Sequence, residues 1–354
     1  MAIEIIGTGR AVPPGRVSND DLAAQIDTSD EWIRSHTGIG NRHIADDNTA
    51  CSDLAAEAAK NALALAAGYA GADAAERDRA AAEAAGSIDM IVLATASADY
   101  YGTPSTACVV QDKIGARNAA AMDITAGCTG FVFGLETAAG LLSVGAQRKR
   151  ALVIGAEVLS RLINWDDRGT CVLFGDGAGA VVLEKTSGDG GNGGDSNRSD
   201  GRGLLRTLMY ADGSGRESLM IKRGGTRNPF KKGEVVDAPV VIEMNGQEVY
   251  NFAVKALTET IEALVKAGNI NVGDIERIVP HQANARIVQA AARRLRIPIE
   301  KFFLNIEEYA NTSSASIPIA LDEMNRGGQL KKGDIILTVG FGGGLTYGGN
   351  IIIW

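Results

Sequence analysis

Hydrophobic and polar positions along the chain form two kinds of stretch. Short apolar runs, typical of buried strands, alternate with longer stretches in which apolar residues recur at helical spacing. The apolar runs predict strands at 3–9, 88–96, 119–124, 149–154, 275–279, 302–306, 335–338 and 350–354, with two further strand pieces inside 171–185. The helical spacing predicts helices at 18–26, 28–33, 52–65, 103–114, 129–142, 245–267, 285–295 and 311–324. Strands and helices that alternate in this way favour parallel sheets covered by helices.

The two halves of the chain repeat this pattern. The strand sequence IDMIV at 88–92 resembles IERIV at 275–279, and each is followed by a helix, a short strand and a corner of small residues. The first corner carries Cys128 and the second carries Asn311. Such a duplication predicts two similar layered halves related by pseudo-twofold symmetry. Ligands of α/β folds bind at strand ends, so the two corners form the candidate site.

Two stretches interrupt the repeat. Residues 70–86 are alanine-rich and charged, which predicts either an extension of the preceding helix or an added helix on the surface. Residues 186–203 are polar and glycine-rich, which is typical of a flexible surface loop. The loop divides the chain into a first half, 1–185, and a second half, 204–354.

Composition excludes several classes of function. The chain has 354 residues and a net charge of −8, so no general attraction to nucleic acid or anionic membranes is expected. Its four cysteines and three histidines show no metal-ligand spacing, and we expect no metal. No signal peptide or membrane-spanning run is evident, which predicts a cytoplasmic protein. The glycine runs FGDGAGA and GFGGG lack the following helix and acidic partner of a dinucleotide site.

Three residues make a possible catalytic group. Cys128 lies at a strand-to-helix corner, where the positive end of the helix favours thiolate. His281 follows the strand at 275–279, and Asn311 lies at the second corner. Each alone has an ordinary explanation: a buried cysteine, a hydrogen-bonded histidine and a helix N-cap. Together they supply a nucleophile, a cation or hydrogen-bond donor, and a neutral donor.

Longer motifs then become informative: TSDEWI, HTGI, DITAGCTGF, DRGT, FGDGAGA, PHQAN, NTSSAS and GFGGGLTYG. With these motifs, in this order over nearly the whole chain, the sequence resembles the β-ketoacyl-acyl-carrier-protein synthase III family, the initiating condensing enzymes of bacterial fatty-acid synthesis. The resemblance implies a duplicated thiolase-like α/β fold, with two pseudo-symmetric βαβ halves in a five-layered αβαβα arrangement. It also implies a homodimer that needs no cofactor.

The resemblance implies a role for each residue of the group. Cys128 would take an acyl group, with acetyl as the expected starter, from acyl-CoA. Malonyl-acyl-carrier protein would then lose carbon dioxide, and its carbanion would attack the acyl-enzyme to give a 3-oxoacyl-carrier protein. His281 and Asn311 would donate to the developing enolate oxygen, and the backbone N–H groups of Cys128 and Gly343 would form an oxyanion hole. The pocket aromatics would be Phe174 and Phe341.

The resemblance further implies two binding surfaces. Trp32 and Arg168 would enclose the adenine of CoA, Asn284 would lie near its pantetheine arm, and His36 stands where the family usually has an arginine near the phosphates. An acidic carrier protein would dock on a basic stripe. That stripe comprises Gln282, Ala283, Asn284, Ala285, Arg286, Arg293 and Arg294. It is less complete than in the family, because Asn251 stands where a lysine is common.

Two alternatives remain open at this point. A related condensing enzyme would use another acyl starter, or malonyl-CoA in secondary metabolism. A protein of a different class would only bind acyl-CoA or hydrolyse its thioester. The residues at 98–104 (ADYYGTP) vary within the family near the acyl pocket and leave the starter undetermined.

Overall fold

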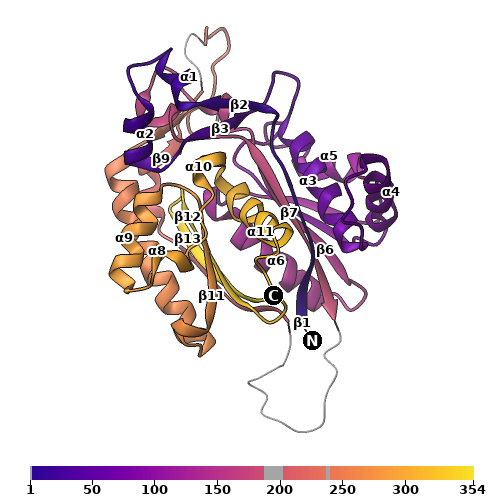
Figure 1. Cartoon of the computed structure of the whole chain (residues 1–354). Helices are drawn as coiled ribbons and strands as arrows, with labels where there is room; N and C mark the ends of the chain where they lie inside the picture. Colours follow the sequence, from indigo (N-terminus) through magenta and orange to yellow (C-terminus); the bar gives the residue numbers. More distant parts are fainter. Residues whose placement is uncertain (1, 187–201, 237–239) are drawn as a thin grey trace.

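Two β-sheets form the frame of the molecule (Figure 1). The structure is a computed structural model, and it describes residues 2–186, 202–236 and 240–354. The first sheet has the order β1-β7-β6-β4-β5, with β1 Ala2–Ala11, β4 Met90–Ala94, β5 Ala120–Ile124, β6 Arg150–Glu157 and β7 Gly177–Thr186. The second has the order β11-β12-β13-β8, with β8 Gly203–Ala211, β11 Ile275–Pro280, β12 Ile335–Gly342 and β13 Thr346–Ile353.

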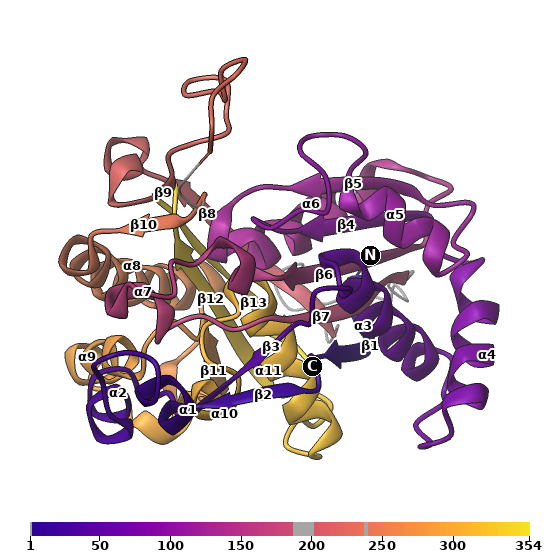
Figure 2. The same ribbon diagram turned by 90° about the horizontal axis from the view of Figure 1, so that it is seen from above.

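Helices cover both sheets and fill the space between them (Figure 2). The central layer consists of α6 Gly130–Val144 and α11 Ser316–Arg326. The outer face of the first sheet carries α3 Cys51–Ala66, α4 Ala74–Ala85 and α5 Thr106–Lys113, and that of the second carries α8 Gly246–Gly268 and α9 Ala285–Leu295. The five layers αβαβα agree with the predicted thiolase-like fold.

The internal repeat is visible in the order of the strands. Each sheet has a parallel pair, β4 with β6 in the first and β11 with β12 in the second. Each parallel pair continues into an antiparallel partner, β7 or β13, and ends with β1 or β8. The helices α6 and α11 occupy corresponding places, since each starts at one of the two corners and packs between the sheets.

The predicted and observed strands of the two main sheets differ in three places. Only one strand, β7, forms within 171–185, because the helix α7 Arg168–Cys171 and the turn after it take the first part. Residues 302–306 form no regular strand: Phe302 makes a single bridge to Ile278, and the helix α10 Ile306–Tyr309 begins at once. β8 was not predicted, although it completes the second sheet.

Two small two-stranded sheets and two short helices cover the end of the molecule that carries the corners. The sheets pair β2 Gly15–Ser18 with β3 Asn41–Ile44 and β9 Leu219–Ile221 with β10 Ile242–Met244. The helices are α1 Asn19–Ala23 and α2 Asp30–Thr37, which are joined through Asn19 and Asp30. The sequence predicted both helices but neither two-stranded sheet.

The two interrupting stretches have different outcomes. Residues 74–85 form the separate helix α4, packed against α3 by Ala81 and Ala85, so the second of the two sequence alternatives is correct. The predicted loop at 186–203 falls largely on residues 187–201, which lie outside the described residues. One helical stretch, Gly127–Val144, is long and apolar enough to cross a membrane, but it is the central helix between the two sheets.

Candidate active site

Cys128 lies in a tight corner between β5 and α6. Gly127 takes a left-handed conformation (φ +51°) that glycine adopts at little cost, and a 3₁₀ turn over Gly127–Thr129 leads directly into the helix. A side chain on Gly342, at the end of β12, would place its Cβ 2.8 Å from Cβ and 3.1 Å from Sγ of Cys128. The thiol therefore depends on a glycine from the other half of the chain for its space.

The Cys128 thiol is neutral near pH 7. Burial raises its pKa to about 12, the Ser313 hydroxyl lowers it, and the negative charge of Glu157 raises it. The sequence led us to expect that the helix end would favour thiolate. Desolvation outweighs that effect here, because no cation among the described residues lowers the pKa of this sulfur.

His281 follows β11 and is almost fully buried. Its backbone N–H donates to Val339 of β12, and its Nδ1 lies 2.7 Å from Oγ of Ser316 at the start of α11. The Phe341 ring meets the imidazole edge-on, with centroids 5.3 Å apart. Burial lowers the pKa of His281 to about 3, so the ring is neutral near pH 7.

Asn311 lies in the second corner. Its backbone pairs with the segment of Phe174, and its side-chain Oδ1 accepts the N–H of Ser313 at 2.9 Å. Its Nδ2 and the Nε2 of His281 make no hydrogen bond within the described part of the chain, yet neither is among its buried polar atoms without a partner. Both atoms therefore reach open space, as groups that contact a substrate must.

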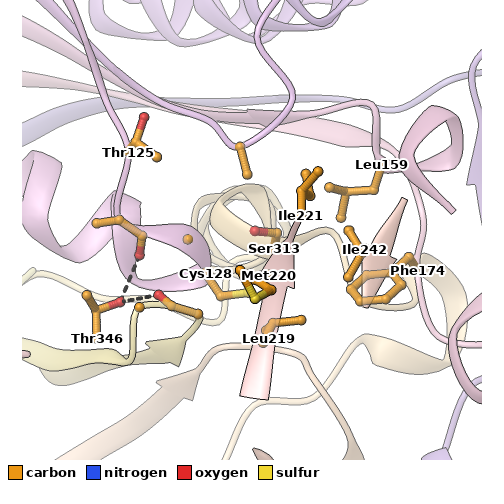
Figure 3. Close-up of a pocket in the computed structure, with 15 residues that line it drawn as sticks. Thr125, Cys128, Leu159, Phe174, Leu219, Met220, Ile221, Ile242, Ser313 and Thr346 are labelled. Carbon is orange, nitrogen blue, oxygen red and sulfur yellow. Dashed lines mark hydrogen bonds between the residues drawn. The ribbon is translucent and has the colours of Figure 1, made fainter. Parts of the chain in front are cut away.

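A cavity of about 350 Å³ opens beside Cys128 (Figure 3). Its walls are mostly apolar, and they come from the two-stranded sheet of β9 and β10, from Phe174 and from Leu159. Ser313, Gly343 and Thr346 line it near the sulfur. His281, Asn311 and Phe341 are not part of its lining, although Ser313 and Gly342 connect them to Cys128.

The backbone beside the thiol is fixed from the second half of the chain. The Thr346 hydroxyl lies 2.9 Å from the carbonyl oxygen of Ala126 and 3.1 Å from that of Gly343. A Cβ on Gly127 would approach the Gly343 oxygen to 3.0 Å, so the two backbones pack closely. Gly343 therefore lies at the same end of the cavity as Cys128, where the sequence placed the oxyanion hole.

The four residues expected at CoA gather at the outer surface, around α2. His36 stacks on Trp32 with ring centroids 4.5 Å apart, and the Arg168 guanidinium lies 4.7 Å from the centre of the Trp32 ring. Asn284 caps α9 and donates from Nδ2 to the His36 carbonyl oxygen at 3.0 Å. Arg168 rests directly on Trp32, so an adenine ring would enter between them only after Arg168 moves.

The proposed carrier-docking segment is divided between interior and surface. Gln282 is buried, and its side chain bonds to the carbonyl oxygens of Pro280 and Phe303 and to the N–H of Asn305. Ala283 and Ala285 are partly buried, whereas Arg286, Arg293 and Arg294 lie exposed along α9. Within this segment, the three arginines are the exposed side chains.

Sequence reasoning gave no role to Ser313, Ser316 or Glu157. The two serines belong to the NTSSAS motif, and their hydroxyls face Cys128 and His281, respectively. Glu157 ends the apolar run of β6, and an acidic residue directly after a buried strand was the available signal. Within the described ranges, no group of three or more His, Cys, Asp or Glu side chains could hold a metal ion.

The fold and the corner chemistry define a thiolase-like protein with a cysteine at the start of its central helix. Residues 122–201 match the protein-family model 3-oxoacyl-[acyl-carrier-protein (ACP)] synthase III, and residues 265–354 match its C-terminal model. A relative from Clostridium acetobutylicum, a β-ketoacyl-[acyl-carrier-protein] synthase III, is 46% identical over 354 residues, with 100% of this chain and 99% of the relative covered. The chain belongs to the β-ketoacyl-[acyl-carrier-protein] synthase III family.

Solved structures agree with this assignment. The 3-oxoacyl-[acyl-carrier-protein] synthase III of Aquifex aeolicus VF5 superimposes with a TM-score of 0.84 at 39% identity, covering 99% of this chain and 100% of that one. The priming β-ketosynthase of the R1128 polyketide pathway gives a TM-score of 0.83 at 29% identity, covering 99% and 96%. The resemblance inferred from the motifs is confirmed.

Proposed function

We propose that the protein condenses an acyl-CoA with malonyl-acyl-carrier protein, releasing CoA and carbon dioxide and forming a 3-oxoacyl-carrier protein. The single observation that carries this proposal is the arrangement at the corners. An apolar cavity ends at Cys128, and two polar atoms with free hydrogen-bonding capacity, on His281 and Asn311, belong to the same contact network. No cofactor is needed for this chemistry, since acyl-CoA is a substrate.

In the first step, Cys128 attacks the thioester carbonyl of acyl-CoA and becomes the acyl-enzyme as CoA leaves. The N–H groups of Cys128 and Gly343 would bind the oxyanion, and one such donor is typically worth about 3 kcal/mol. A neutral thiol must lose its proton for this attack. The neutral imidazole of His281 and the departing CoA sulfur are the groups that can accept it.

In the second step, the malonyl group loses carbon dioxide and its carbanion attacks the acyl-enzyme. His281 and Asn311 would donate to the enolate oxygen. A neutral His281 donates from Nε2 only if Nδ1 accepts. The Ser316 hydroxyl lies 2.7 Å from Nδ1 and also donates to the Ser313 carbonyl oxygen at 2.9 Å, so this tautomer requires the hydroxyl proton to turn from Ser313 to His281. Phe341, edge-on to His281, would keep water away from the malonyl carboxylate and so favour its loss.

The volume of the cavity bears on which acyl group the enzyme accepts as its starter. Acetyl is the starter expected from the sequence, but an acetyl group would fill a small part of a 350 Å³ cavity. An apolar cavity of about 150 Å³ already holds a six-carbon ring, and each buried methylene contributes about 0.8 kcal/mol. The cavity therefore favours the alternative of a longer or branched starter, with Met220 as an adaptable wall.

The binding surfaces follow from the same proposal. CoA would insert its adenine between Trp32 and Arg168, with His36 behind Trp32 and Asn284 beside the pantetheine arm. The acidic carrier protein would dock on the exposed arginines of α9. A basic stripe on a chain of charge −8 is suited to steer an acidic partner.

Three broader expectations remain proposals. We infer a homodimer, and the free edge of the first sheet at β5, next to the corner of Cys128, supports it. We also infer a cytoplasmic location and two pseudo-symmetric halves, 1–185 and 204–354. The matched orders of the two sheets support that division.

Intact-mass analysis after incubation with a panel of acyl-CoAs tests the proposal. We expect an acyl adduct on the wild type and none on Cys128→Ala, with a larger adduct yield from starters of about six to ten carbons than from acetyl-CoA. The acyl-enzyme should yield a 3-oxoacyl product with malonyl-carrier protein. Turnover only with malonyl-CoA would favour the secondary-metabolism alternative, and free acid without a new carbon–carbon bond would favour a hydrolase.

A further inference from the structure

Arg42 is a buried arginine for which the proposed mechanism has no use. It lies on β3, has no solvent exposure and is among the largest of the fully buried side chains. Burial lowers the pKa of its guanidinium to about 10, so the group is still charged near pH 7. Burying a charge is costly, so an arginine kept in this position calls for a physical reason.

The hydrogen bonds of Arg42 end in three separate segments. Its Nη1 donates to the carbonyl oxygen of Val17 in β2 at 3.2 Å. Its Nη2 donates to Oδ1 of Asn19 at 2.8 Å and to the carbonyl oxygen of Val172 at 3.1 Å. All three acceptors are neutral, so these bonds fix positions without neutralising the charge. The planar fork of a guanidinium can reach several acceptors at once, which the ammonium group of a lysine cannot do with the same geometry.

Asn19 extends the connection from Arg42 to α2. It is fully buried, and its Nδ2 donates to Oδ1 of Asp30, the first residue of α2, and to the carbonyl oxygen of Ile39, each at 2.8 Å. Its backbone N–H donates to the carbonyl oxygen of Gly40 at 3.2 Å. One asparagine, bonded to Arg42 through Oδ1, therefore fixes both the start of α2 and the chain just after its end.

Val172 extends the connection from Arg42 to α7. It directly follows this helix as its C-cap and is buried. The Nη2 atom of Arg42 thus joins the end of α7 to the asparagine that fixes α2. These two helices carry the residues expected to enclose the adenine of CoA, Trp32 in α2 and Arg168 in α7. A single buried side chain therefore links the two sides of the candidate adenine site.

A second link between the two sides lies at the surface. The Nη1 of Arg168 donates to the carbonyl oxygen of Asp27, between α1 and α2, at 2.9 Å, and its guanidinium lies 4.7 Å from the centre of the Trp32 ring. This link must give way when adenine enters, because Arg168 occupies the face of Trp32 that the ring would take. The bonds of Arg42 are buried beneath the surface and need not change.

We propose that Arg42 is a positioning residue for the binding of acyl-CoA, which holds α7 and α2 in fixed places so that Arg168 and Trp32 remain on opposite sides of the adenine. The proposal rests on the proposed use of acyl-CoA. Arg42 acts through Asn19 and Val172 and needs no contact with the substrate. A binding site whose walls are held in place before the ligand arrives loses less free energy on ordering them.

The rival explanation is a structural role only. Apolar side chains of the same region, among them Ile33, Ile39 and Val172, already form a common buried cluster. If Arg42 merely adds to the stability of this cluster, its replacement should lower the free energy of unfolding without changing which acyl donor the enzyme prefers.

The test compares two acyl donors in the self-acylation of Cys128. Acetyl-CoA and hexanoyl-CoA are each compared with the N-acetylcysteamine thioester of the same acyl group, which has the thioester but no adenine. The ratio of the two rates measures the contribution of the adenine end, and any loss of folded protein cancels in it. Arg42→Lys keeps a positive charge and removes the fork, so the ratio should fall about tenfold, as it should in Trp32→Ala.

Arg16→Gln is the matched control. Arg16 lies on β2 of the same two-stranded sheet, but its guanidinium is exposed and bonds to Glu308 at 2.8 and 2.9 Å. We expect this variant to keep the wild-type ratio. An unchanged ratio in Arg42→Lys, or an equal fall in Arg16→Gln, would overturn the proposal and leave Arg42 with a structural role only.

If Arg42→Lys does not fold, Asn19→Ala decides the question, because it removes the link to α2 and leaves the bonds of Arg42 to Val17 and Val172. A wild-type ratio in that variant contradicts the proposal, as does a wild type that uses both donors at equal rates. The absence of any adduct from either donor would instead contradict the proposed function, and this inference with it. The two failures are therefore distinguishable.

Discussion

The two corners of the duplicated fold are built alike and filled differently. In each, a residue with positive φ opens a 3₁₀ turn that leads directly into a central helix: Gly127 before α6 and Ser313 before α11. By this correspondence, Cys128 and Ser314 occupy equivalent positions. A Cβ on Gly340 would meet Thr129 of one turn, and a Cβ on Gly155 would meet Ser314 and Ala315 of the other.

The two corners differ at the residue two positions further along the adjacent strand, which is Gly342 of β12 in one case and Glu157 of β6 in the other. Gly342 faces Cys128, and its missing side chain leaves open space beside the sulfur. Its counterpart is Glu157, whose buried carboxyl group accepts a hydrogen bond from the Ser314 hydroxyl. One corner therefore leaves space beside its sulfur, whereas the other holds a buried polar side chain. The comparison teaches that the candidate site lies where the duplicated scaffold omits a side chain.

The prediction with the largest expected effect separates the two chemical steps, self-acylation of Cys128 and decarboxylation of malonyl-carrier protein. Asn311→Ala should reduce decarboxylation of malonyl-carrier protein about 100-fold or more, because it removes a donor to the enolate, and should affect self-acylation much less. Cys128→Ala should lose the acyl adduct while carbon dioxide release remains measurable. Radiolabelled carbon dioxide release and intact mass report the two steps. Equal losses of both steps in Asn311→Ala would contradict the separate roles predicted for Asn311 and Cys128.

A second test fills the space beside the sulfur of Cys128. Gly342→Ala would place a methyl group 2.8 Å from the Cβ of Cys128, and the sulfur must move in response. A displacement of this size should slow self-acylation about 100-fold. Gly140→Ala on the exposed face of α6, where a Cβ would meet nothing within 4 Å, is the control and should retain full self-acylation. Rates from quenched single-turnover reactions decide; a fast Gly342→Ala enzyme would show that the space is dispensable.

Much of this comparison was accessible from the sequence. The repeat of apolar runs located both corners, and periodicity placed α9 at its observed bounds. The motifs of the first corner, together with His281 and Asn311, gave the candidate catalytic group. The predicted corners and the helix α9 agree with the structure because hydrophobic spacing and chain order are properties of the sequence itself. The catalytic roles of the three residues stay predictions.

Contacts between the halves were not accessible. The bond between Glu157 and Ser314 joins residues 157 positions apart, and no local pattern encodes it. The thiol form of Cys128 was also missed, because helix polarity is a local feature while desolvation depends on the whole fold. The strand expected at 302–306 failed for a related reason: the segment lies beside β11 with a single bridge and turns into α10.

A third test uses the pH dependence of the free energy of unfolding, in which His281 acts at acid pH and Cys128 at alkaline pH. The pKa of His281 is lowered from 6.5 to about 3, so the unfolded chain binds more protons and stability is lost as pH falls below 6.5, by about 2 kcal/mol at pH 5. The pKa of Cys128 is raised from 9.0 to about 12, so its contribution is lost as pH rises above 9, by about 1 kcal/mol at pH 10.

Urea unfolding across pH measures both effects. Relative to wild type, His281→Gln should flatten the acid limb only, and Cys128→Ala the alkaline limb only. Variants that flatten the opposite limb, or neither, would contradict the neutral state assigned to both side chains.

The smallest expected effect concerns the backbone of the second corner. Ala310, directly before Asn311, is held at φ +56° and ψ −155°, a region that is essentially reserved for glycine. Ala310→Gly should therefore stabilise the protein by about 1 kcal/mol, since relief of 1–3 kcal/mol of strain exceeds the entropy that glycine adds to the unfolded chain. The control is Ala315→Gly at φ −77°, where no strain exists and glycine should destabilise. Urea unfolding compares the two.

If Ala310→Gly also slows decarboxylation while self-acylation is kept, the strained alanine serves to hold Asn311, and the contrast between a glycine-based open corner and a strained second corner acquires a functional meaning. Destabilisation by Ala310→Gly would show that the second corner carries no strain to relieve.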